Sequence, residues 1–125
     1  MPAKQVLIVE DERPIREMIA FGLKRAGFEV REANVGDLAP VKRRLQVPAA
    51  LQSCHTAVIG DYVVEGHVPA DLIRRLLRER PAVLGLAVPG MPVGAPGMEA
   101  PGRPAERYDV LTFDRSGRTT VFARR

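Results

Sequence analysis

The sequence predicts a single α/β domain over residues 1–125, with a sheet that begins parallel and continues antiparallel. Three observations lead to this fold class. The chain opens with an apolar run, an amphipathic segment and a second run, which is typical of a parallel strand–helix–strand unit. Two short apolar runs then flank Gly60-Asp61, a two-residue hairpin signal. Hydrophobic residues make up 46% and charged residues 27% of the chain, the balance of one soluble globular domain.

The first unit spans a strand, a helix and a second strand. Residues 6–9 are continuously apolar, which predicts a strand buried on both faces. Helical spacing predicts a helix over residues 15–25 that ends at Gly27, and alternation predicts a strand over residues 28–33. The helix should turn four side chains to the core, namely Ile15, Met18, Ile19 and Leu23.

The central part of the chain predicts two further helices around the hairpin. Gly36-Asp37-Leu38 opens a helix that runs to about residue 45, with Leu38, Val41 and Leu45 on its inner face. Residues 56–59 and 62–65 must pair antiparallel, because two residues leave no room for a crossover helix. A third helix starts at residues 69–71 and ends at Pro81, and its inward residues are Leu72, Ile73, Leu76 and Leu77.

The last part combines a long loop with a second hairpin. Residues 85–104 are rich in Gly and Pro and lack periodicity, so they are expected to form a loop. Strands are predicted at 108–113 and 119–123, around a turn at 114–118. The resulting order, β-α-β-α-β-β-α with an added C-terminal hairpin, is the thioredoxin-like arrangement.

Charge and composition restrict the partners and the location. The formal net charge is +4, but the arginines are dispersed and aromatic residues are only 5%, so we expect no nucleic-acid partner. The apolar run at residues 6–9 is too short for a signal peptide or a membrane span. We therefore expect a cytoplasmic protein with no membrane contact.

Soft metal donors gather in residues 51–69, which contain the only cysteine, Cys54, and both histidines, His55 and His67. Met91 and Met98 in the loop add thioether donors. Each residue has an alternative without metal: Cys54 as a small buried residue, His55 as a backbone hydrogen-bond partner, His67 in helix capping or packing, and the methionines as a lid.

Residues 4–33 resemble the start of a response-regulator receiver domain of the phosphate-regulon type, above all in the run VLIVEDERPIREM at 6–18. The resemblance implies that Glu10 and Asp11 could help to hold Mg²⁺ beside a phospho-accepting aspartate, for which Asp61 is the candidate. Capping of the following helix is the alternative role of these acidic residues. Lys42 is the last lysine of the chain, so the lysine that a receiver needs after its fifth strand is missing and phosphorylation is not expected.

Residues 26–123 resemble small copper-resistance proteins of the CopG type, also catalogued as a domain of unknown function. The segments that carry the resemblance are residues 47–57, 62–70, 85–99 and 108–114. It implies a thioredoxin-like fold and Cu(I) held by thiolates. That family begins with a cysteine cluster at the start of its first helix, where this chain has the run EDERP at 10–14. The chain thus combines a receiver-like start (1–33) with a copper-protein-like body (34–125).

These observations predict a non-enzymatic copper-binding protein with a depleted cysteine site. The candidate ligands are Cys54, His55, His67, Met91 and Met98, and a homodimer could supply further thiolates. The alternative is a receiver-like phosphorelay module with an acidic Mg²⁺ site at Glu10, Asp11 and Asp61 that is not phosphorylated. A thiol oxidoreductase ranks last, because one cysteine leaves no resolving thiol within the chain.

Overall fold

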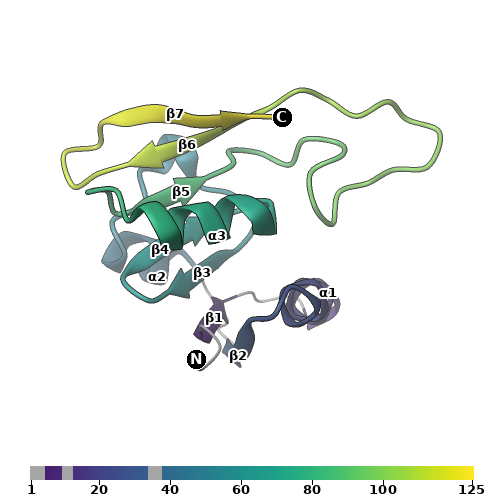
Figure 1. Cartoon of the computed structure of the whole chain (residues 1–125), viewed down its shortest axis with the longest axis horizontal. Coiled ribbons are helices and arrows are strands. Elements are labelled where there is room, and N and C mark those ends of the chain that lie inside the picture. Colours follow the sequence, from purple (N-terminus) through teal and green to yellow (C-terminus); the bar gives the residue numbers. More distant parts are fainter. Residues whose placement is uncertain (1–4, 10–12, 34–37) are drawn as a thin grey trace.

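The computed structural model describes residues 5–9, 13–33 and 38–125. Within them one mixed sheet has the strand order β2-β1-β3-β4-β5-β6-β7 (Figure 1). Strand β1 pairs parallel with β2 and antiparallel with β3, whereas β4 pairs antiparallel with β3 and parallel with β5. The strands are β1 (Gln5–Val9), β2 (Glu29–Ala33), β3 (Thr56–Ile59), β4 (Tyr62–Glu65), β5 (Gly85–Ala87), β6 (Asp109–Phe113) and β7 (Thr119–Arg124).

Helices cover both faces of the sheet and form two separate cores. They are α1 (Arg13–Arg25), α2 (Ala39–Arg44), the 3-10 turn η1 (Ala49–Leu51) and α3 (Ala70–Glu79). The larger core joins α1 and α3 to one face of the sheet, through residues such as Ala20, Ile59 and Leu76. The smaller core joins the α2–η1 segment to the opposite face, around Val63 and Phe113.

The structure confirms the α/β class and the order of elements expected up to α3. Ile59 pairs with Tyr62 across the β3–β4 turn, and Gly60 has a φ of +59°, a conformation that glycine adopts without strain. The C-terminal hairpin is also confirmed. Its turn is closed by Asp114, whose Oδ1 accepts hydrogen bonds from the backbone N–H groups of Ser116 and Arg118.

The expected loop over residues 85–104 is wrong at its start, because Gly85–Ala87 is the buried strand β5. This strand is too short to show alternation, and its glycine is required by packing. A Cβ on Gly85 would stand 1.7 Å from the carbonyl oxygen of Val63, so the strand depends on close backbone approach. These residues form a strand because they pair with β4 and β6, and not because of a hydrophobic pattern in their own sequence.

Two helix faces also differ from the expectation. On α1, Ala20 is buried while Met18 is 43% exposed, so Met18 is not a core residue. On α2, the buried residue is Lys42. The expected inner residues of that helix, Leu38, Val41 and Leu45, are only half-buried, as is Leu77 on α3. On α1 the buried face is thus rotated from the predicted one. On α2 a lysine on the predicted face is buried more deeply than its apolar neighbours.

None of the helices within the described residues is both long enough and apolar enough to cross a membrane.

Candidate metal centre

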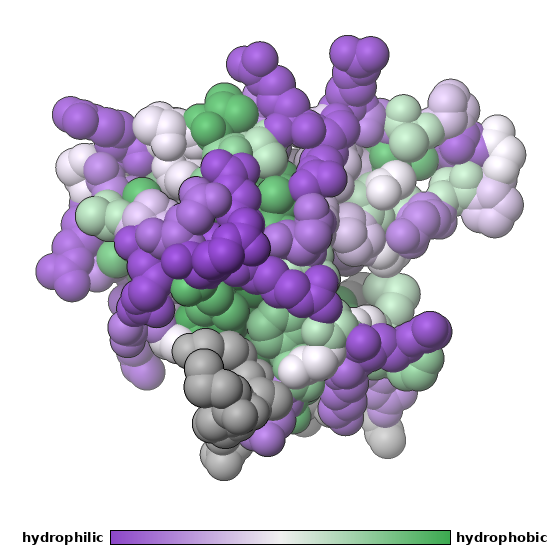
Figure 2. All heavy atoms as spheres, viewed as in Figure 1, coloured by the Kyte–Doolittle hydropathy of each residue, from purple (hydrophilic) through white to green (hydrophobic). Residues whose placement is uncertain are grey.

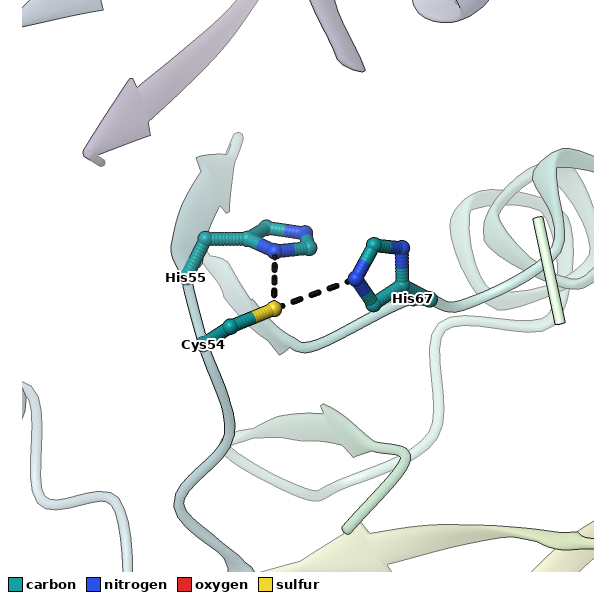
Figure 3. Close-up of side chains that lie close together, drawn as sticks. All are labelled: Cys54, His55 and His67. Atoms are coloured by element: carbon teal, nitrogen blue, oxygen red, sulfur yellow. Dashed lines mark hydrogen bonds between the residues drawn. The ribbon is translucent and has the colours of Figure 1, made fainter. Parts of the chain in front are cut away.

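Three soft donors meet at one end of the β3–β4 hairpin. Cys54 and His55 directly precede β3, and His67 lies two residues after β4. Because Thr56 pairs with Glu65, the segments beyond these two residues leave the sheet side by side. The Sγ of Cys54 lies 3.1 Å from Nδ1 of His55 and 3.1 Å from Nε2 of His67 (Figure 3). One donor atom from each residue lies within 4.8 Å of the others.

A backbone contact orients the ring of His67. Its Nδ1 lies 2.6 Å from the carbonyl oxygen of Pro96, which can only accept a hydrogen bond. Nδ1 therefore carries the proton and donates, and in the neutral ring Nε2 keeps its lone pair toward Cys54. Histidine ligands in metal sites are commonly oriented by such a contact on the second nitrogen.

Burial keeps both imidazoles neutral. The pKa of His55 is lowered from 6.5 to about 3, mainly by burial and further because a charged His55 would be repelled by Lys42 and by a protonated His67. Burial also lowers the pKa of His67, against an opposing effect of its hydrogen bond to Pro96. A neutral imidazole is the form that binds metals, so protons compete weakly for these two nitrogens near neutral pH.

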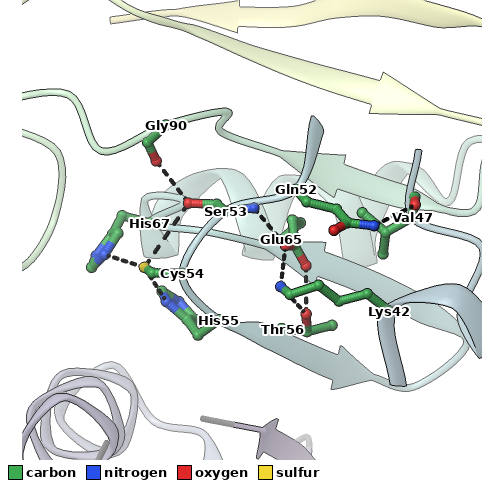
Figure 4. A network of polar contacts seen from close by, with 10 residues as sticks. All are labelled: Lys42, Val47, Gln52, Ser53, Cys54, His55, Thr56, Glu65, His67 and Gly90. Atoms are coloured by element: carbon green, nitrogen blue, oxygen red, sulfur yellow. Dashed lines mark hydrogen bonds and ion pairs between the residues drawn. The ribbon is translucent and has the colours of Figure 1, made fainter. Parts of the chain in front are cut away.

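A buried carboxylate holds both ends of the Cys54–His55 dipeptide. The Oε2 of Glu65 accepts a hydrogen bond of 2.7 Å from the backbone N–H of Ser53, and its Oε1 accepts one of 2.5 Å from the hydroxyl of Thr56. The ammonium of Lys42 pairs with Glu65 and donates to the Thr56 hydroxyl at 2.8 Å (Figure 4). The side chain of Glu65 is fully buried, so these partners supply its solvation.

Sequence reasoning missed this network of Lys42, Glu65 and Thr56. A signal for it exists, because Lys42 falls between Leu38 and Leu45 on the apolar face expected for α2. Glu65 likewise ends an otherwise apolar strand. Two opposite charges placed on faces that should be buried indicate a pair.

An apolar cleft of about 520 Å³ borders the centre. It lies between α1 and the β3–α3 side of the sheet, and Figure 2 shows apolar surface between these helices. Its polar side chains are those of His55, His67 and Glu99. Met18 and Phe21 line it from α1. A metal held at the centre would thus have mostly apolar surface beside it.

The loop methionines do not line this cleft. Met91 is 57% exposed, and Met98 is half-buried in a turn where its N–H bonds to the carbonyl oxygen of Ala95 at 2.7 Å. Their assignment as ligands stays a prediction.

Of the predicted acidic Mg²⁺ site, Asp61 is the member that the structure describes. Val9, at the end of β1, pairs with Thr56, whereas Asp61 follows Ile59 at the other end of β3. The side chain of Asp61 is 89% exposed and pairs with Arg80 at 3.4 Å. Glu10 and Asp11 lie outside the described residues. The antiparallel β1–β3 pairing thus places Asp61 at the end of β3 that is away from Val9. The acidic site stays a prediction.

Comparisons with known proteins relate the whole chain to copper resistance. Two solved structures of the copper resistance protein CopG superpose on this chain with TM-scores of 0.90 and 0.89, and each is 41% identical to it in sequence. Each comparison covers at least 98% of both chains. The family model described as "Protein of unknown function, DUF411" matches residues 51–98, which include all three clustered donors.

A second set of relatives consists of transcriptional regulators. The chain is 33% identical over 87 residues to the phosphate regulon transcriptional regulatory protein PhoB of Pseudomonas aeruginosa, and 34% over 77 residues to that of Escherichia coli. It spans only 31% of the length of these curated relatives.

Proposed function

Because the chain belongs to the family of the copper resistance protein CopG, we propose that it binds copper and that Cys54, His55 and His67 hold one ion. The observation that carries this proposal is the gathering of one sulfur and two imidazole nitrogens within 4.8 Å of one another. A thiolate with neutral imidazoles suits copper, and thiolate in particular favours Cu(I).

The spacing of the donors fits a bound ion. Metal–sulfur bonds of about 2.3 Å and metal–nitrogen bonds of about 2.0 Å place the ligand atoms about 3.5 Å apart. The sulfur of Cys54 lies 3.1 Å from each nitrogen, a few tenths of an ångström closer than this spacing, whereas the three donor atoms are spread over up to 4.8 Å. Binding would therefore open the sulfur contacts slightly and draw the two imidazoles together. The anchoring of Ser53 and Thr56 on Glu65 keeps the dipeptide in place while this happens.

Copper bound here would be stored or sequestered, and the proposal assigns no catalytic step to the chain. One thiolate per chain cannot bridge several ions, so the expected stoichiometry is one copper per monomer. A homodimer that shares the thiolates of two chains is the alternative. The β2-β1-β3-β4 order supports our inference that the core is thioredoxin-like.

A phosphorelay role rests on the similarity to the PhoB regulators, whose length the chain covers only in part. The surroundings of Asp61 do not favour it, because that carboxylate lies in a hairpin turn and Lys42 is buried against Glu65. Incubation with acetyl phosphate and Mg²⁺, followed by intact-mass measurement, tests the phosphorelay role. An added phosphate on Asp61 would support that role.

Anaerobic titration of the reduced protein with Cu(I), in competition with a chromogenic chelator, tests the copper proposal. We expect one Cu(I) per chain, and Cys54→Ala should lower the affinity by more than about 100-fold, beyond the loss typical of residues that only support ligands. Asp61→Asn is the matched surface control and should bind like the wild type. Unchanged Cu(I) affinity in a folded Cys54→Ala variant would sink the proposal.

A further inference from the structure

Met18 on α1 faces the same cleft as the two imidazoles. It was expected in the core, yet it is 43% exposed and lines the cleft together with His55 and His67. Both Met18 and the imidazole of His67 lie near Gly97. A Cβ placed on that glycine would stand 3.0 Å from the Cε of Met18 and 3.3 Å from the Nδ1 of His67. The methionine methyl and the imidazole therefore lie against the same backbone position.

The side chain of Met18 has the chemistry of a copper ligand, and it lines the cleft that borders the centre. A thioether is a soft donor that suits Cu(I), and methionine has three rotatable side-chain bonds that let the sulfur move within a cleft without backbone change. The surrounding residues of α1, such as Ile19 and Phe21, are apolar. Glu99 also lines the cleft, but its carboxylate is a hard donor that suits Cu(I) less well than a thioether. Among the described residues, Met18 is the sulfur donor that lines this cleft.

We propose that Met18 is the fourth ligand of the copper ion, which makes the centre a mononuclear Cys-His-His-Met site. The proposal rests on copper binding at Cys54, His55 and His67. Two histidines and a cysteine with a weaker methionine are the donor set of blue-copper sites. A single-ion site of this kind needs no second chain, in contrast to a thiolate-bridged cluster.

The test compares Met18→Leu, which keeps size and apolar character, with Met91→Leu and Met98→Leu. Cu(I) affinity is measured by chelator competition, and X-ray absorption of the Cu(I) protein counts the sulfur ligands. We expect Met18→Leu to lower Cu(I) affinity by roughly tenfold and to reduce the sulfur ligands from two to one. The two loop variants test the alternative assignment of Met91 and Met98 as ligands. If Met18 is the fourth ligand, both should match the wild type.

Zn(II) separates a ligand role from a packing role. Zinc sites use cysteine, histidine and carboxylate ligands rather than thioether, so Met18→Leu should leave Zn(II) affinity unchanged. An equal loss for both metals would show that Met18 only supports the fold of the centre, and the proposal would be overturned. Unchanged Cu(I) affinity would overturn it as well, and so would a loss on Met91→Leu or Met98→Leu instead.

The outcomes also separate this proposal from the one beneath it. If the wild type binds one Cu(I) that Cys54→Ala loses, while Met18→Leu binds normally, only the role of Met18 fails. If Cys54→Ala retains full Cu(I) binding, the proposed copper site is refuted, and the proposed role of Met18 is refuted with it.

Discussion

Two polar clusters lie at the same end of the β3–β4 hairpin. They differ in how their polar groups are paired. Around Glu65, the carboxylate, the ammonium of Lys42 and the hydroxyl of Thr56 satisfy one another within the chain. Around Cys54, a thiol lies against two neutral imidazoles. The first cluster pairs opposite charges and serves stability. The second groups soft donors, and it is the cluster that holds the ion under the proposed function.

The two clusters are connected through four consecutive residues. Ser53 and Thr56 are anchored on Glu65, while Cys54 and His55, between them, face the metal centre. The self-contained cluster therefore positions the donors of the other one. Variants that disturb one cluster and spare the other test this division.

Removing the charge of Glu65 should have the largest effect. Glu65→Gln leaves the ammonium of the buried Lys42 without its counter-charge, and breaking a buried pair in this way costs about 3–5 kcal/mol of unfolding free energy. Chemical denaturation of the metal-free protein measures the loss. Asp61→Asn, which breaks the exposed pair with Arg80, is the control and should leave stability unchanged.

A double variant identifies the source of that loss. Lys42→Met combined with Glu65→Gln removes the unpaired ammonium and should be more stable than Glu65→Gln alone. If the double variant is as unstable as the single one, the buried charge is not the reason for the loss.

A methyl group at Gly66 should have the next largest effect, because this residue lies between the two clusters. Its φ is +79°, and a Cβ would stand 2.6 Å from the carbonyl oxygen of Val88 and 2.9 Å from the Oγ of Ser53. We expect Gly66→Ala to cost about 2–4 kcal/mol from backbone strain and overpacking, and to weaken Cu(I) binding by displacing Ser53. Denaturation and metal titration on the same sample measure both.

Gly117 supplies the matched control, since its φ is +83° and nothing lies within 4 Å of its Cβ position. Gly117→Ala should show only the strain of the positive φ, about 1 kcal/mol. Equal losses at the two glycines would refute the close contact at Gly66.

The pH dependence of the metal-free protein should report His55. Its pKa is about 3 when folded and near 6.5 when unfolded, so the unfolded state binds more protons between these values. Stability from this group is complete above pH 6.5 and falls as the pH drops toward 3, by at most about 1.4 kcal/mol per pH unit. Denaturation across this range should show a shallower slope in His55→Asn, and an identical slope would mean that His55 is not buried neutral.

The smallest effect is expected at the hydroxyl of Ser53. It donates a 2.7 Å hydrogen bond to the carbonyl oxygen of Gly90, and its contact with the Sγ of Cys54 is long, at 3.9 Å. The backbone N–H of Ser53 makes the bond to Glu65. Ser53→Ala should cost about 1 kcal/mol or less, and should change Cu(I) affinity by less than about twofold. A large loss of affinity would mean that the hydroxyl, and not the backbone contact, positions Cys54.

Local signals predicted the parts of the fold that depend on neighbouring residues. Gly60-Asp61 predicted the β3–β4 hairpin, because a two-residue turn is specified by its own residues. The strand β5 was missed, since its three residues become a strand only between β4 and β6. Met18 was assigned to the core by helical spacing, yet the packing of α1 turned it into the cleft.

The sequence by itself determined which donors exist, because Cys54 and both histidines lie within one short segment of a chain with a single cysteine. Only the tertiary structure decided that His67 reaches Cys54 across 13 residues, and that Lys42 reaches Glu65 across 23. These contacts depend on how the hairpin folds back and on which face α2 buries. Pairing over such separations is set by the packing of the whole sheet, which no local pattern records.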